Sequence, residues 1–87
     1  MYIHLGNNIM LPTDEIIGIF DLENTSVSKR TRDFLNRAEK QGRVITISYD
    51  LPRSFVIAGK TLEDSKIYIS QISSSTLLKR TGYIASL

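Results

Sequence analysis

The chain has 87 residues and a formal net charge of +2 at pH 7, and its 41% hydrophobic and 23% charged residues predict one globular domain, residues 1–87. No run approaches the ~20 apolar residues that span a bilayer, and the start lacks a signal-peptide pattern, so we expect a cytoplasmic protein without membrane contacts. Cysteine is absent and histidine occurs once, which excludes disulfides, cysteine-based metal sites and histidine clusters as supports for a small core. Self-association is therefore a reasonable expectation.

The N-terminal part alternates short apolar runs with turn residues. Residues 2–5 and 9–11 have strand character, and the Gly-Asn-Asn sequence at residues 6–8 accepts the positive φ of a tight turn. These features predict a β-hairpin. The dense, β-branched apolar run at residues 16–22 has strand length and predicts a buried strand.

The clearest periodic signal is an amphipathic helix over residues 26–41. Its apolar stripe comprises Val27, Thr31, Phe34, Leu35 and Ala38. We expect Thr25 or Ser26 to cap the start of this helix and Gly42 to end it. Basic residues fall outside the stripe, so the exposed side is either an ordinary solvated face or a surface that faces phosphates.

After the helix the apolar period changes to two, which predicts strands. Residues 44–49, 55–58 and 67–69 form three predicted strands, joined by a proline-containing connection and a polar loop. Ser74 or Ser75 is expected to cap a short C-terminal helix. The predicted fold class is α+β: a small, mostly antiparallel sheet of short strands, one amphipathic helix in the middle and a short C-terminal helix.

No catalytic signature occurs in the sequence. A phosphate-binding loop of the Gly-x-x-x-x-Gly-Lys-Ser/Thr type is absent. His4 falls inside a predicted strand, where a structural role outweighs a functional one. The paired acids at residues 14–15 and 63–64 lie near predicted loops, and neighbouring side chains often point apart. We therefore expect no enzyme activity, no bound metal and no cofactor.

Charge is distributed unevenly along the chain. Residues 1–25 carry four acidic and no basic side chains, whereas residues 26–43 carry six basic and two acidic ones. The candidate phosphate contacts are Lys29, Arg30, Arg32, Arg37 and Arg53. Arg53 stands in a short connection from which a guanidinium can project freely, and the alternative for each of the five is an ordinary solvated side chain. The tyrosines do not interleave with basic residues as in a base-stacking platform, so contacts with nucleic acid are expected to be salt-dependent phosphate contacts.

Three segments carry a resemblance to a known family. They are Met-Tyr-Ile-His-Leu-Gly at residues 1–6, Ile-Ile-Gly-Ile-Phe-Asp at residues 16–21 and Ile-Ser-Ser-Ser-Thr-Leu-Leu-Lys-Arg at residues 72–80. Together with the helix, strand, proline and strand pattern between them, they make nearly the whole chain similar to the RemA/RemB family. The resemblance implies a cytoplasmic bacterial protein, without enzyme activity, concerned with transcription of extracellular-matrix (biofilm) genes.

The family resemblance also implies partners. RemA is understood as a DNA-binding protein that assembles into a closed ring and contacts DNA around its rim. For this chain the resemblance implies a ring-like homo-oligomer that binds double-stranded DNA, with a RemA-like paralogue as a further candidate partner. The contact loop of RemA carries a Gly-Arg-Arg-Thr-Arg segment, whereas residues 49–54 here read Tyr-Asp-Leu-Pro-Arg-Ser, so Arg53 alone carries over.

Two functions from different classes remain open from the sequence. The first is a DNA-associated, homo-oligomeric regulator of matrix genes that uses Arg53 and the basic helix on phosphates and gains affinity by repeating weak sites around a ring. The second is an oligomeric protein-interaction scaffold that modulates another regulator without binding DNA. The missing arginine cluster and the acidic N-terminal segment favour the second.

Overall fold

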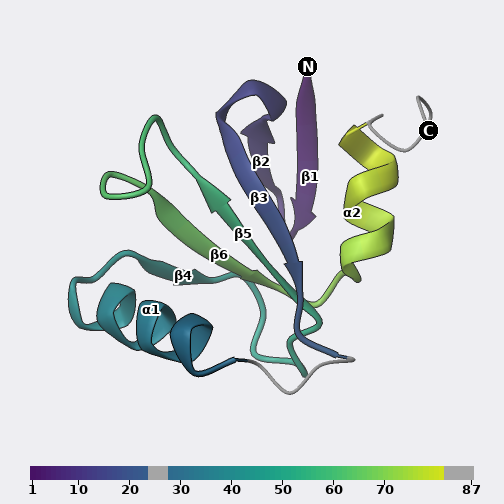
Figure 1. Cartoon of the computed structure of the whole chain (residues 1–87). Helices are drawn as coiled ribbons and strands as arrows, with labels where there is room; N and C mark the ends of the chain where they lie inside the picture. The colour runs from purple at the N-terminus through teal and green to yellow at the C-terminus, as the bar shows by residue number, and fades with distance from the viewer. Residues whose placement is uncertain (24–27, 82–87) are drawn as a thin grey trace.

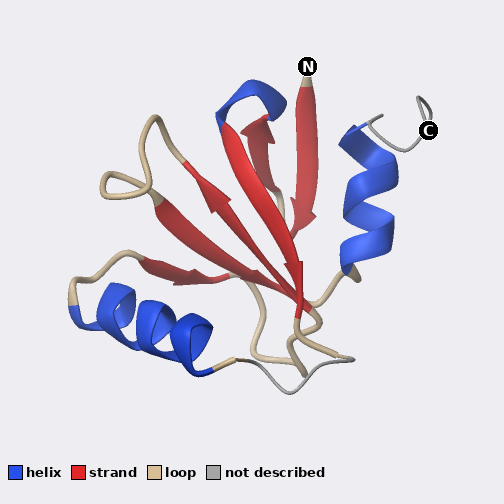
Figure 2. Cartoon of the chain, viewed as in Figure 1, coloured by secondary structure: helices blue, strands red, loops and turns tan. Residues whose placement is uncertain are grey.

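The computed structural model describes residues 1–23 and 28–81, and within them it places two α-helices and six strands (Figures 1 and 2). In chain order the elements are β1 (Tyr2–Gly6), β2 (Ile9–Pro12), the 3-10 helix η1 (Thr13–Glu15), β3 (Ile16–Asp21), α1 (Lys29–Lys40), β4 (Val44–Thr46), β5 (Ser54–Ala58), β6 (Lys66–Ser70) and α2 (Ser74–Thr81). The predicted α+β class is therefore confirmed. In the described ranges, neither helix is long and apolar enough to cross a membrane.

The strands form two sheets. β1 and β2 make an antiparallel hairpin whose turn contains Asn7 and Asn8 at φ of 49° and 65°, as the sequence predicted. The second sheet has the strand order β3-β5-β6-β4, in which β4 and β6 run parallel and the other pairs antiparallel. The sheets are thus mostly antiparallel, and the hairpin forms a layer of its own instead of extending the larger sheet.

The larger sheet is covered on both faces by apolar side chains. One face packs against the hairpin and α2, with a core of Ile3, Leu5, Leu11, Ile47, Val56, Ala58 and Leu77. The other face packs against α1, with a core of Ala38, Phe55, Ile57 and Ile67. β5 contributes to both cores because successive side chains of a strand point to opposite faces.

The start of α1 lies later than the sequence predicted. The helix begins at Lys29, and the Oγ of Ser28 caps it by accepting a hydrogen bond from the backbone N of Thr31 at 3.2 Å. The expected caps, Thr25 and Ser26, lie outside the described residues. Ser28 has the side-chain chemistry that they offered, and it stands one residue before the helix.

The predicted apolar stripe of α1 faces the sheet. Ala38 is fully buried, and Phe34 and Leu35 pack against the same core. Thr31 is half-buried at the margin of this contact, while Val27 lies outside the described residues. The opposite side of the helix is left to solvent.

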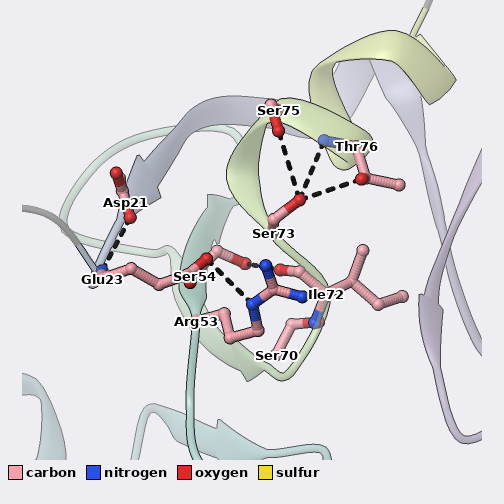
Figure 3. A network of polar contacts seen from close by, with 9 residues as sticks. All are labelled: Asp21, Glu23, Arg53, Ser54, Ser70, Ile72, Ser73, Ser75 and Thr76. Atoms are coloured by element: carbon pink, nitrogen blue, oxygen red, sulfur yellow. Dashed lines mark hydrogen bonds and ion pairs between the residues drawn. The ribbon is translucent and has the colours of Figure 1, made fainter.

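The cap of α2 lies one residue earlier than predicted. The Oγ of Ser73 accepts a hydrogen bond from the backbone N of Thr76 at 3.3 Å (Figure 3). Ser74 and Ser75, the predicted caps, lie inside the first turn instead. Because three serines stand in a row, residue type does not identify which of them precedes the helix.

β4 is shorter than the predicted strand at residues 44–49 and ends at Thr46. Ile47 follows it with a buried side chain, and its carbonyl oxygen accepts a hydrogen bond from Nδ2 of Asn7 at 3.2 Å. The side chain of Asn7 in the hairpin turn thus bonds the carbonyl oxygen of Ile47, which would pair with a neighbouring strand if β4 were longer.

Ser70 joins the hairpin to the larger sheet. Its buried Oγ donates a hydrogen bond to the carbonyl oxygen of Leu5 at 2.8 Å and accepts one from the backbone N of Ile72 at 3.0 Å. One side chain therefore satisfies polar groups of two segments far apart in the sequence.

We predict that Ser70→Ala lowers the free energy of unfolding by about 1–3 kcal/mol, because both backbone groups lose a partner where water is excluded. Urea denaturation measures this loss. The matched control is Ser48→Ala, which removes two exposed hydrogen bonds, one to Gln71 and one from the backbone N of Asp50, and should change stability by less than about 0.5 kcal/mol. Equal stability of the Ser70→Ala protein and the wild type would contradict the proposed link between the sheets.

Candidate nucleic-acid interface

The basic side chains of α1 lie on its outer surface. Lys29, Arg30, Arg32 and Arg37, the four helix residues predicted from the sequence, are all exposed. The helix carries five basic and two acidic side chains in total. Because the apolar stripe is held against the sheet, the positive charge is displayed to solvent.

The first turn of α1 carries positive charge where a helix favours negative charge. It contains no acidic residue, and Lys29, Arg30 and Arg32 stand close to the positive end of the helix dipole. Each such charge opposes the dipole by about 0.3–1 kcal/mol at low ionic strength. The stability of the helix does not account for this cluster, whereas an anion bound beside it would relieve the repulsion.

The structure brings only some of the predicted helix residues together. Arg30 and Arg37 are seven residues apart and therefore share one flank of α1, while Arg32 lies on the other flank. Arg30 lines a groove beside Phe20 of β3, and Arg37 lines a neighbouring hollow. The helix thus presents two basic flanks.

Arg43 lines the same hollow as Arg37, and no sequence motif marks it. Its Nη1 donates hydrogen bonds to the carbonyl oxygens of Leu62 and Ser65 at 3.2 and 2.9 Å. Its guanidinium also lies 5.9 Å from the ring centroid of Phe34. These contacts anchor the loop before β6 to the start of β4. Because the acceptors are carbonyl groups about twenty residues away, the sequence holds no signal for this role.

Arg53 lies outside α1, in the connection before β5, where it pairs with Glu23 (Figure 3). Its backbone N donates to the carbonyl oxygen of Ser70 at 2.9 Å, and its own carbonyl oxygen accepts from the N of Leu22 at 3.0 Å. Its Nε lies 2.9 Å from Oε1 of Glu23. The N of Glu23 is in turn bonded to Oδ1 of Asp21 at 2.7 Å, which brings a second carboxylate close by.

The expectation that Arg53 projects freely is therefore wrong, because Glu23 holds its guanidinium. Both side chains are partly exposed, and an ion pair of this kind contributes only about 0–1 kcal/mol. Loss of this pair alone would therefore change the stability of the fold little.

Outside the basic surfaces, the described residues hold few groups with chemistry of their own. Within them, no three metal-ligating side chains gather. Burial raises the pKa of the Tyr68 hydroxyl above its usual value, and the Glu15 carboxylate raises it further. The basic surface of α1 is the strongest candidate site in this part of the chain.

Comparison with known proteins agrees with the resemblance seen in the sequence. A family model described as RemA-like, extracellular matrix regulatory protein A-like, matches residues 2–81. The extracellular matrix regulatory protein B of Bacillus subtilis (strain 168) is 36% identical over 84 residues, which cover 97% of this chain and 94% of that protein. The roles of the five basic residues stay a prediction, but the chain belongs to the RemA-like family of extracellular matrix regulatory proteins.

Proposed function

We propose that this protein regulates extracellular-matrix (biofilm) gene expression in the cytoplasm as a DNA-associated homo-oligomer without enzyme activity. The observation that carries the proposal is the basic first turn of α1. Its positive charges are repelled by the helix dipole, and an anionic ligand would reduce that repulsion. The printed name of the Bacillus subtilis relative, an extracellular matrix regulatory protein, supports the regulatory role.

Phosphates of double-stranded DNA are the proposed ligand of this surface. Lys29 and Arg32 flank the start of α1, where backbone N–H groups and the helix dipole also favour an anion. Arg37 extends the positive surface along the helix, and Arg53 adds a contact when phosphate replaces Glu23. Contacts of this kind position a protein on DNA without reading its sequence.

Self-association strengthens such weak binding. A few phosphate contacts per subunit give low affinity, but several subunits that engage one duplex multiply their affinities through effective concentration. The chain has large apolar side chains on its surface that are available for subunit contacts, among them Phe20, Tyr49, Leu51 and Leu62. A ring-like homo-oligomer presents its basic helices repeatedly to the same duplex.

A second candidate function is an oligomeric scaffold that modulates another regulator, such as a RemA-like paralogue, without touching DNA. Two observations favour it. Arg53 is already paired with Glu23, and the connection before β5 exposes Tyr49 and Leu51 in place of further arginines. The experiments below separate the two functions.

We predict that reversing charge at the start of α1 weakens DNA binding without destabilising the fold. In the Lys29→Glu, Arg32→Glu double variant, the salt slope of log K should fall by about 0.9 per lost phosphate contact. The free energy of unfolding should stay constant or rise by about 0.3–1 kcal/mol per charge, because the dipole is now complemented. Fluorescence anisotropy with a generic duplex at several salt concentrations, together with urea denaturation, measures both effects.

The matched control is the Lys60→Glu, Lys79→Glu double variant, which changes net charge equally at exposed positions outside α1. Its salt slope should stay close to that of the wild type. If both double variants lose affinity equally, only net charge matters, and the surface of α1 is removed from the proposal. Wild-type protein that ignores DNA even at low salt supports the scaffold.

Arg53 is tested through its partner. We predict that Arg53→Ala weakens DNA binding uniformly across sequences and lowers the salt slope, while Glu23→Gln strengthens binding because it releases the guanidinium. The same titrations measure both, and neither substitution should change stability by more than about 1 kcal/mol. Unchanged affinity in both variants would limit Arg53 to its structural pair with Glu23.

A further inference from the structure

An apolar groove lies between α1 and the β3 side of the larger sheet. α1 packs on β4 and β6 and buries Phe55 and Ile57 of β5, but it leaves Phe20 of the edge strand β3 partly exposed. Side chains of Phe20, Phe55, Ile57 and Leu62 line the groove, and Arg30 lines it from α1. Its volume is about 260 Å³. Pockets for small molecules usually enclose roughly 300–1,000 Å³, so the groove matches one or two side chains better than a ligand of that kind.

The aromatic wall of the groove is held rigidly. The ring of Phe20 stacks on Phe55 with centroids 4.8 Å apart and planes 13° from parallel. On the strand itself the ring lies over Gly18, where an added Cβ would come within 2.6 Å of it. Phe20 nevertheless remains 43% exposed. The fold thus keeps a large apolar surface open instead of turning it into the core.

The connection between β4 and β5 has the complementary chemistry. Tyr49 is 98% exposed and Leu51 is 83% exposed, and the exposed acidic Asp50 stands between them. Arg30 and Asp50 form no ion pair within the described residues. An apolar projection that carries a negative charge therefore matches an apolar groove whose lining includes a positive charge.

The projection and the groove lie at the same end of the molecule. The connection leads directly into β5, whose second residue, Phe55, forms part of the groove. The hydrogen bond from Leu22 N to the carbonyl oxygen of Arg53 joins the connection to the end of β3, the other groove strand (Figure 1). Because the projection and the groove are different surfaces of one chain, each copy can place its projection in the groove of the next. Head-to-tail contacts of this kind form a ring when the rotation between copies closes.

We propose that this groove is the contact surface for a second copy of this chain. Tyr49 and Leu51 of one copy enter the groove of the other, and Asp50 pairs with Arg30 across the contact. The inference rests on the self-association in the proposed function and names the surface that produces it. In this arrangement Arg30 contacts the other copy of the chain. Lys29 and Arg32 are then the basic residues of the first turn that remain available to bind phosphate.

Light scattering across a range of protein concentrations tests the contact. Leu51→Asp should raise the dissociation constant of the contact about tenfold or more, since burial of a leucine is lost and a charge enters an apolar groove. Because Leu51 is exposed in the single chain, the substitution leaves folding intact, as circular dichroism verifies. The matched control is Met10→Asp on the hairpin, where a 56% exposed apolar side chain is replaced and the mass should not change.

A charge exchange makes the test specific. Arg30→Asp and Asp50→Arg should each weaken the contact, and the variant that combines both should recover the mass of the wild type. An oligomer whose mass is unaffected by Leu51→Asp and by both charge reversals overturns this contact while the proposed self-association stands. A wild-type chain that is monomeric at every concentration overturns both, whereas the Lys29 and Arg32 variants still decide DNA binding. Loss of DNA binding in Leu51→Asp at unchanged mass would assign the projection to DNA and overturn the contact.

Discussion

The burial of β5 is the constraint on which the rest of the structure depends. All five residues of this strand are buried, and it lies between β3 and β6 in the larger sheet. Phe55 and Ile57 point to the core under α1, while Val56 and Ala58 point to the core shared with the hairpin and α2. A register slip of one residue would exchange the two faces, so both cores hold the strand in one register. That register places the connection before β5 and the aromatic wall of the groove at one end of the sheet.

The surface of the fold differs in charge between α1 and the neighbourhood of Arg53. The first turn of α1 holds basic side chains near the positive end of the helix dipole. Their repulsion destabilises the helix when no anion is bound, whereas the same charges would attract an anionic ligand. Around Arg53 the chain instead places the carboxylates of Asp21 and Glu23, and Glu23 holds the guanidinium. In the proposed arrangement the basic helix therefore contributes most to DNA binding. Arg53 adds a smaller contact, and the apolar connection beside it joins copies of the chain.

Signals that span a few residues predicted the local structure well. The hairpin, the central helix and the later strands follow from apolar periods of two and 3.6 and from turn residues, and each depends only on near neighbours in the chain. The residues at which the helices begin were harder to predict from the sequence. Ser28 caps α1 and Ser73 caps α2 because tertiary packing determines where each helix begins, and several serines and threonines nearby have the same capping chemistry.

By itself the sequence determined the α+β class, the membership in the family and the excess of positive charge on the central helix. Only the tertiary structure decided that β4 and β6 pair in parallel, that Glu23 restrains Arg53 from thirty positions away, and that α1 leaves a groove open beside Phe20. The physical reason is the range of the interactions. Periodicity and composition record contacts along the chain, whereas ion pairs, strand order and uncovered surface depend on segments that meet only after folding.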